Sequence, residues 1–270
     1  MKFSLALLKT RLRDSLSPRV QVPLKYLLNY LGGSLEEELN LIPYLVSPGD
    51  RVVDVGGNRG VYTYYFWRHG LNVDVFEPNE VCLKVLLGWA RNKTSITVHS
   101  VALSDVSGTS NLSIPLDSAG VEHDAAGTIR EIFSGGMRQQ PVTVKRLDDY
   151  GLEGVVFIKI DVEGQELKVL RGAHALLRKQ QPAILVEVEQ RHQEDDMYKT
   201  FRYLKNLGYS GYFLRGGRLV SIDSFNREAD QNLKYLNGSK GAYVNNFFFL
   251  HQNLVCKSKY KSLFEVWGRS

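Results

Sequence analysis

The feature that most constrains the fold is a regular alternation of short apolar runs and helical segments between residues 51 and 190. The apolar runs are rich in valine and isoleucine and end in glycine or an acidic residue, as buried strands do in α/β proteins. Strands that alternate with helices of this length indicate βαβ units and a parallel sheet. We expect strands at 51–57, 72–78, 96–104, 155–164 and 183–190, helices at 61–70, 79–93, 165–180 and 194–208, and partly antiparallel closing strands within 211–223 and 245–252.

The chain divides into a central domain with additions at both ends. We expect a helical extension at 1–47, a ligand-binding α/β domain at 48–252 with a variable substrate insert at 105–140, and a C-terminal tail at 253–270. The extension has leucines at helical spacing, Leu5, Leu8, Leu12 and Leu16, among basic residues. We expect it to pack on the domain or on a partner subunit. Contact with an anionic membrane surface is the weaker alternative.

Composition narrows the class of protein. The 34 Lys and Arg residues exceed the 29 Asp and Glu residues, giving a net charge of +5, which is too small to indicate nucleic-acid binding. Cys82 and Cys256 stand in no motif, so we expect neither a disulfide framework nor a thiolate metal site. No apolar run approaches the roughly 20 residues of a membrane span. The apolar run before Lys9 is also shorter than that of a secretory signal. We expect a cytoplasmic protein.

A glycine-rich turn follows the first expected strand, with the sequence Asp54-Val55-Gly56-Gly57-Asn58-Arg59-Gly60. Glycine permits a tight turn and a close approach of ligand to backbone. The spacing of Gly56 and Gly60 does not fit the dinucleotide fingerprint, because Asn58 fills the middle position. A carboxylate at Asp54 would accept hydrogen bonds from an amine or cationic group. Alternatively, the stretch is a structural turn in which Asp54 caps the helix.

The second expected strand ends in Glu77-Pro78, 23 residues after Asp54. An acid in the crevice beyond the carboxyl ends of parallel strands can accept both hydroxyls of a ribose. The alternative is a surface carboxylate at the start of a loop. Because nucleoside binding without a phosphate cradle is typical of S-adenosylmethionine, this ligand is our interpretation of the two motifs together.

Three charges accompany the apolar run VFIKIDVEGQE at 156–166. Strand alternation puts Lys159, Asp161 and Glu163 on one face, and the next strand repeats the arrangement with Glu187 and Glu189. Burial of charges is unfavourable unless they are paired or bind a ligand. The pattern allows a catalytic role for these residues, and it also allows a structural network in which their charges neutralise one another. The two interpretations are compatible.

Five stretches, DVGGNRG, FEPN, VALSD, IKIDVEGQELKVLRGA and PAILVEV, make the sequence resemble the FkbM-type methyltransferase family from about Gly49 to about Gln190. The resemblance implies a Rossmann-like class I methyltransferase fold, with a mostly parallel seven-stranded sheet flanked by helices. It also implies S-adenosylmethionine as donor and an acceptor hydroxyl on a sugar, glycan or polyketide- or lipid-type natural product. Carried over residue by residue, the donor-binding set is Asp54, Gly56, Asn58, Gly60, Glu77, Asn79, Ala102, Leu103 and Asp161.

The reaction that follows is in-line O-methylation, for which the protein aligns the reactants and removes the hydroxyl proton. Asp161 is our first candidate for the base, Glu163 the second and Glu187 the third, with Lys159 tuning their charge. His123 with Asp124 is a lower-ranked rival in the insert. The carboxylates could also hold Mg²⁺, which the spacing does not indicate.

Two other classes of function remain open at this point. One is a nicotinamide-dependent oxidoreductase, which the glycine spacing disfavours. The other is a donor-binding, non-catalytic partner of a glycan-modifying complex. We expect a small-molecule or glycan acceptor and no nucleic acid as partner, and the sequence leaves the oligomeric state open.

Overall fold

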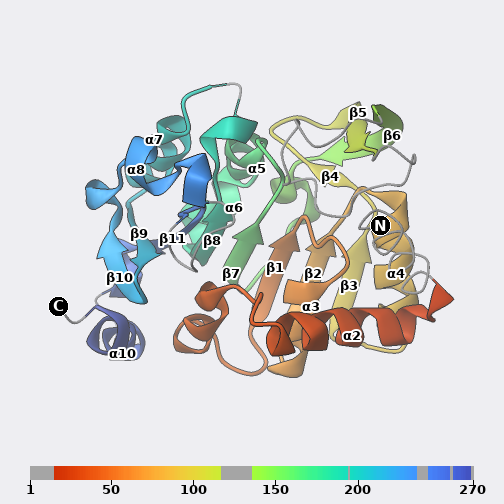
Figure 1. Cartoon of the computed structure of the whole chain (residues 1–270), viewed down its shortest axis with the longest axis horizontal. Helices are drawn as coiled ribbons and strands as arrows, with labels where there is room; N and C mark the ends of the chain where they lie inside the picture. Colours follow the sequence, from red (N-terminus) through yellow and green to blue (C-terminus); the bar gives the residue numbers. More distant parts are fainter. Residues whose placement is uncertain (1–14, 117–135, 194, 236–242, 256–257, 269–270) are drawn as a thin grey trace.

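The computed structural model describes residues 15–268 apart from 117–135, 194, 236–242 and 256–257. Over these residues the central sheet has eight strands in the order β10-β9-β11-β8-β7-β1-β2-β3 (Figure 1). Its strands are β1 Arg51–Val55, β2 Asn72–Phe76, β3 Ile96–His99, β7 Val155–Ile160, β8 Ala183–Glu187, β9 Tyr209–Arg215, β10 Arg218–Ser221 and β11 Asn246–His251. The predicted α/β fold is confirmed.

The strand directions follow the predicted pattern. β1 pairs in parallel with β2 and β7, and further parallel pairs join β2 to β3 and β7 to β8. β11 is antiparallel to both β8 and β9, as the closing segment suggested. The eighth strand is β10, an edge strand that forms a hairpin with β9 and extends the expected set of seven.

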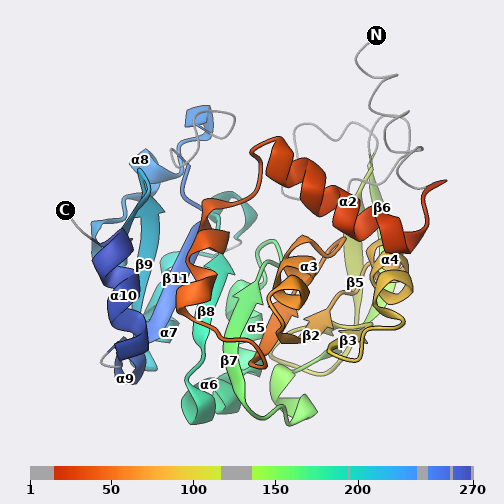
Figure 2. The ribbon, with the colours of Figure 1, turned by 90° about the horizontal axis from the view of Figure 1, so that it is seen from below.

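Helices cover both faces of this sheet (Figures 1 and 2). One face carries α2 Pro18–Leu31, α3 Val61–Arg68, α4 Glu80–Ala90 and α10 Ser258–Trp267, and the other carries α5 Glu166–Gly172, α6 His174–Gln180 and α7 Tyr198–Asn206. The sheet has a hydrophobic core on each face, because successive side chains of a strand point to opposite faces. On β7, Phe157 packs with the first group of helices, whereas Ile158 and Ile160 pack with the second. The short helices α8 Arg227–Asp230 and α9 Gln252–Val255 lie near the C-terminal end of the chain.

Two expected elements are divided in the structure. The segment 96–104 separates into β3 and the short strand β4 Ala102–Leu103, because β4 leaves the main sheet and pairs with β6 Met137–Lys145. β6 also pairs antiparallel with β5 Gly108–Pro115, which lies within the expected insert. The segment 165–180 is two helices, α5 and α6, because the chain departs from helical geometry at Ala173.

The described part of the N-terminal extension packs directly on the sheet's helices. A Cβ on Gly60 would lie 3.3 Å from Val22 of α2, and a Cβ on Gly88 would lie 2.7 Å from Pro18. The rings of Tyr26 and Tyr64 are 5.0 Å apart. These contacts seat α2 on α3 and α4. The predicted leucine repeat at Leu5, Leu8 and Leu12 lies outside the described residues, as does Cys256.

Candidate functional site

The glycine turn brings the ends of three strands together. Gly56 has a φ of 80°, and a Cβ there would lie 1.9 Å from the carbonyl oxygen of Asp161. A Cβ on Gly57 would lie 2.2 Å from Val75 of β2. The backbone N–H of Asp161 also donates to the carbonyl of Val55 at 3.0 Å. Glycine is therefore required here because the turn lies directly against its neighbours, and this contact holds Asp161 beside the turn.

Asp54 lies beneath this turn rather than at its surface. Its side chain is 1% exposed and accepts a hydrogen bond from the Thr63 hydroxyl at 2.6 Å. Burial raises the pKa of Asp54 to about 6, against the opposing effects of Thr63 and Lys159. Thr63 lies in the first turn of α3, so Asp54 joins the end of β1 to that helix. This bond supports the alternative of a capping, structural role at least as well as direct contact with a donor.

Glu77 organises the opposite side of the turn. One of its carboxylate oxygens accepts from the backbone N–H of Asn58 at 2.6 Å, and the other accepts from that of Asn79 at 2.7 Å. Burial raises the pKa of Glu77 to about 7, and these two hydrogen bonds act against the rise. A carboxylate can accept about four hydrogen bonds, so two directions stay available for ribose hydroxyls.

The remaining residues of the expected donor set have structural tasks of their own. Asn58 adopts a φ of 46°, and its side-chain oxygen accepts from the N–H of Arg59 at 2.6 Å. Asn79 caps α4 by accepting from the N–H of Val81 at 2.9 Å. Ala102 and Leu103 form β4 on the small sheet.

Lys159 is the centre of a buried charged cluster. Its side chain is 1% exposed, its Nζ donates to the Asn246 side-chain oxygen at 3.1 Å, and it lies 5.0 Å from the centre of the Tyr62 ring. Nζ is also 3.9 Å from Oε2 of Glu187. Burial alone lowers the pKa of Lys159, but four surrounding carboxylates outweigh burial and raise it, those of Glu36, Asp161, Glu187 and Glu38. Lys159 is therefore a charged ammonium at neutral pH.

Asp161 and Glu187 form a hydrogen-bonded carboxyl pair beside this ammonium. Burial raises the pKa of both groups, and that of Glu187 lies well above its ordinary value. Two adjoining carboxyls cannot easily be charged together, so they hold a proton between them. The pair as a whole therefore retains one ionised carboxylate, which is the state that a base needs.

Glu163 departs from the expected strand face. β7 ends at Ile160, and Glu163 has a left-handed backbone with a φ of 55°, so strand alternation no longer applies to it. Its carboxylate points to His192, at 3.4 Å from Nδ1. Partial burial and the neighbouring carboxylates raise the pKa of Glu163 to about 8. The predicted shared face of Lys159, Asp161 and Glu163 is therefore wrong for Glu163.

Three members of the cluster were missed by sequence reasoning as site residues. Glu36 of the N-terminal extension accepts hydrogen bonds from the hydroxyl of Tyr62 and, at 3.1 Å, from the side-chain amide of Asn246. Tyr62 lies in the segment where the helix 61–70 is expected, and no pattern in the sequence singles out Glu36 or Asn246. Hydrogen bonds across the fold place them around Lys159.

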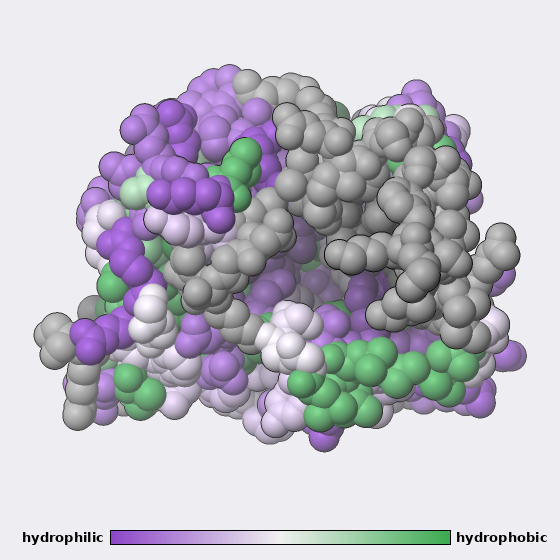
Figure 3. Space-filling model, viewed as in Figure 1, coloured by the Kyte–Doolittle hydropathy of each residue, from purple (hydrophilic) through white to green (hydrophobic). Residues whose placement is uncertain are grey.

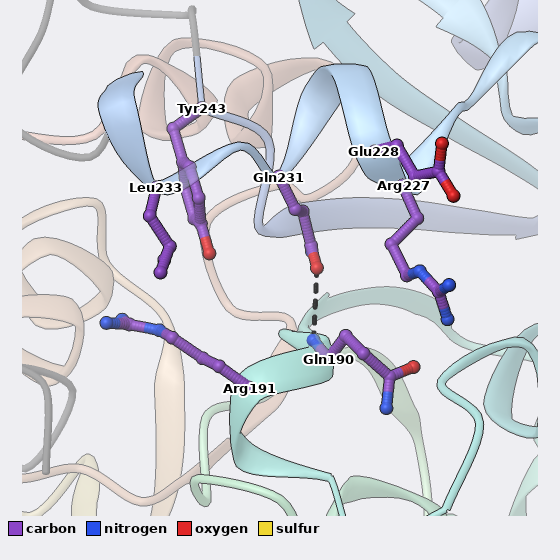
Figure 4. Close-up of a pocket in the computed structure, with 7 residues that line it drawn as sticks. All are labelled: Gln190, Arg191, Arg227, Glu228, Gln231, Leu233 and Tyr243. Carbon is purple, nitrogen blue, oxygen red and sulfur yellow. Dashed lines mark hydrogen bonds between the residues drawn. The ribbon is translucent and has the colours of Figure 1, made fainter.

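A pocket of about 300 Å³ lies beside Arg191 and Tyr243, the two partners of Glu189 (Figure 4). Its lining residues are Gln190, Arg191, Arg227, Glu228, Gln231, Leu233 and Tyr243. Within it the backbone N–H of Gln190 donates to the side-chain oxygen of Gln231 at 3.0 Å. The pocket connects to the cluster through Glu189, whose carboxylate binds both Arg191, at 2.6 Å, and the hydroxyl of Tyr243, at 2.6 Å. The charge of Glu189 also contributes to the raised pKa of Asp161.

The chemistry of the turn fits S-adenosylmethionine better than a dinucleotide. Asp54, Glu77 and Asp161 bring three carboxyl groups to it, and they interact electrostatically with one another. The guanidinium of Arg59 binds Gln21 of α2 at 3.1 Å instead of entering the turn. A pyrophosphate would be repelled by these carboxylates, whereas the amino and sulfonium groups of the methyl donor are cationic.

Within the described parts of the chain, no group of three or more His, Cys, Asp or Glu side chains is arranged to hold a metal ion. The rival base pair His123 and Asp124 lies outside those parts.

The sheet order, with one antiparallel strand between the last two parallel ones, is that of the class I methyltransferase fold. A family model described as the methyltransferase FkbM domain matches residues 54–210. This match covers more than half of the chain, and the chain belongs to that family of S-adenosylmethionine-dependent methyltransferases.

Solved structures of methyltransferases also resemble the chain. The FkbM methyltransferase from Methylobacillus flagellatus KT has 16% identity and a TM-score of 0.48, and the match covers 76% of this chain but 44% of that protein. Fibrillarin from Aeropyrum pernix, solved with natively bound S-adenosyl-L-methionine, has 14% identity and a TM-score of 0.42 over 76% of this chain and 68% of that one. An rRNA methylase from Streptococcus thermophilus has 10% identity and a TM-score of 0.44 over 80% and 95%. No curated protein matches this chain.

Proposed function

We propose that the chain transfers a methyl group from S-adenosylmethionine to a hydroxyl oxygen of a polyhydroxylated acceptor, such as a sugar, glycan or related natural product. The observation that carries this proposal is the Asp161–Glu187 carboxyl pair, which lies beside the buried Lys159 and next to the glycine turn. When bound, the donor supplies an electrophilic methyl group. A hydroxyl acceptor needs a nearby carboxylate to take its proton, and Asp161 is positioned to do so.

Each charged residue of the cluster has a distinct task in this proposal. Glu187 keeps the shared proton and orients Asp161, and Lys159 keeps Asp161 ionised by its positive charge. Glu36 and Asn246 complete the site. The Glu36 carboxylate can accept hydrogen bonds from further hydroxyls of the substrate, and the Asn246 side-chain amide can donate to them. Glu163, whose carboxylate turns to His192, ranks behind Glu187 on this geometry.

The pocket beyond Glu189 is the proposed seat of the remainder of the acceptor. Its lining of amide, guanidinium, carboxylate and phenol groups suits hydroxyl-rich ligands, because each of these groups donates or accepts hydrogen bonds. Leu233 adds an apolar surface for a sugar ring face.

The test uses tritium-labelled donor with a panel of glycans, free sugars and hydroxylated lipids, followed by mapping of the methylated atom. Asp161→Asn should lower kcat at least about 100-fold, the usual range for loss of a general base, with S-adenosylhomocysteine binding retained. Glu163→Gln is the matched control, with an effect of less than about fivefold. Full activity of Asp161→Asn would exclude Asp161 as the base. Methylation of nitrogen or carbon would overturn the acceptor class. Full retention of activity in EDTA would rule out the Mg²⁺ alternative.

A further inference from the structure

The helix α2 is apolar on two opposite sides. Its inner side packs on the domain through Val22, which is 1% exposed, and Tyr26. Its outer side presents a stripe of large apolar residues at helical spacing, of which Leu27 is 47%, Leu28 58% and Leu31 71% exposed. Val20, at 46% exposed, continues this stripe towards the start of the helix. A helix with two apolar sides has only one of them covered by its own domain.

The stripe forms a continuous surface. Figure 3 shows it as the hydrophobic band over α2, next to the hydrophilic hollow of the molecule in the same view. Contiguous apolar patches of this kind mark contact sites for proteins or membranes, whereas isolated exposed leucines carry no such meaning.

The distribution of charge decides which kind of partner the exposed stripe of α2 would bind. Residues 1–35 contain six of the chain's 34 Lys and Arg residues and one of its 29 Asp and Glu residues, so the other 235 residues have 28 of each and no net charge. The whole net charge of +5 therefore belongs to α2 and the segment before it. Between Ser15 and Leu35 there is no acidic residue. A second copy of this surface would add like charge to like charge, whereas an anionic bilayer is complementary to it.

The sequence before α2 has the same character. In residues 1–14, Leu5, Leu8 and Leu12 recur at three- and four-residue steps among Lys9 and Arg11. Among the helices that the structure describes, none is long and apolar enough to cross a bilayer. An exposed apolar stripe beside basic residues is suited to contact with lipid head groups and the outer acyl region.

We propose that α2, together with the basic segment that precedes it, seats the protein on an anionic lipid surface. Five residues after Leu31 the chain reaches Glu36, which binds Tyr62 and Asn246 in the charged cluster. The docking helix and the candidate site are thus joined by a short connection. This proposal concerns binding and stands independently of the reaction assigned to the site.

The test is vesicle flotation of the full-length protein with phosphatidylcholine alone and with 30% phosphatidylglycerol, at low and high salt. We expect binding to the anionic vesicles, weakening as salt rises. Leu27→Glu/Leu31→Glu should lower the partition coefficient by roughly 100-fold, because each leucine that leaves water contributes at least about a tenfold factor. Arg11→Gln/Arg13→Gln should weaken binding and reduce its salt dependence.

Val106→Glu is the matched control, because Val106 is a 63% exposed valine outside the stripe, and its binding should equal that of the wild type. Unfolding temperature and S-adenosylhomocysteine binding verify that each variant folds. Failure of the wild type to bind anionic vesicles, or equal loss in Val106→Glu, would overturn the proposal. If Leu27→Glu/Leu31→Glu instead converted a dimer to a monomer with no change in vesicle binding, the stripe would be a contact between copies of the chain and not a membrane surface.

Discussion

Replacement of Lys159 by methionine is the sharpest test of the buried charged cluster. The substitution keeps the approximate length and packing of the side chain and removes its charge. Nζ of Lys159 lies 3.9 Å from Glu187, and with an effective dielectric constant of about 20 its attraction to the one negative charge that the Asp161–Glu187 pair retains is about 4 kcal/mol. Loss of one partner of a buried pair usually costs about 3–5 kcal/mol, so we expect that loss in the free energy of unfolding at pH 8.

The loss should shrink as pH falls. Lys159 lowers the pKa of Glu38, Asp54, Asp161 and Glu187, so its removal raises those values further. In the wild type, burial already raises the pKa of Asp54 to about 6 and that of Glu38 to about 7. A carboxyl whose pKa is higher in the folded state contributes stability below its unfolded pKa and loses it as pH rises through the folded value. The free energy of unfolding of the variant should therefore approach that of the wild type as the pH falls from 8 to 5.

Urea denaturation at pH 5, 6.5 and 8 measures these differences. Lys179→Met is the control, because Lys179 lies closer to its partner Glu153, at 2.8 Å, but both side chains are mostly exposed. It should change stability by less than about 0.5 kcal/mol at every pH. Lys159→Met/Glu187→Gln should recover part of the loss, since one of the unbalanced acids is gone. An equal loss for both lysine variants, or a loss independent of pH, would refute the reasoning.

Three further outcomes follow from other contacts. Burial raises the pKa of Glu77 to about 7, so its charged form is depleted below that pH, and calorimetry should show S-adenosylhomocysteine binding weaken from pH 8 to pH 6 in the wild type but not in Glu77→Gln. Gly56→Ala should destabilise the fold by more than about 4 kcal/mol because its Cβ meets backbone, whereas Gly216→Ala, with a φ of 58° and open space, should cost about 1–2 kcal/mol in urea denaturation. Tyr62→Phe removes the hydroxyl that donates to Glu36, so it should raise the KM for the acceptor and leave donor binding unchanged. Tyr65→Phe removes a hydroxyl that donates to the Leu39 carbonyl, and it should leave both unchanged.

The position of the glycine turn beside Glu77 could be predicted from the sequence because its signals are local. The turn after β1 and the acid after β2 each lie within a few residues of a strand end, and the parallel sheet brings such ends to one edge. Strand alternation also placed Lys159 on the correct face of β7, opposite Ile158 and Ile160. Alternation failed at Glu163 because it assumes extended backbone, and the chain turns left-handed there.

The surroundings of Lys159 could not be predicted because they are assembled from distant segments. Asn246 and Glu36 are 210 positions apart in the sequence, and Lys159 is 87 positions from Asn246. Neither Glu36 nor Asn246 belongs to a motif, and a glutamate before a short helix ordinarily predicts an exposed side chain. Their meeting depends on how the N-terminal extension crosses the domain and on the antiparallel insertion of β11, which are properties of the complete fold.

The location of Glu36 gives the N-terminal extension a part in the site. Glu38, two residues further on, has its pKa raised to about 7 by burial and by the charge of Glu36, so this segment brings two acids toward Lys159. α2 also reaches the glycine turn, because Gln21 binds the guanidinium of Arg59 at 3.1 Å and Val22 lies against Gly60. A displacement of α2 would therefore act on the acids around Lys159, through the segment that carries Glu36 and Glu38, and on the glycine turn at the same time. It follows that a contact made by α2 can influence both the surroundings of Lys159 and the turn, because the same helix supports both.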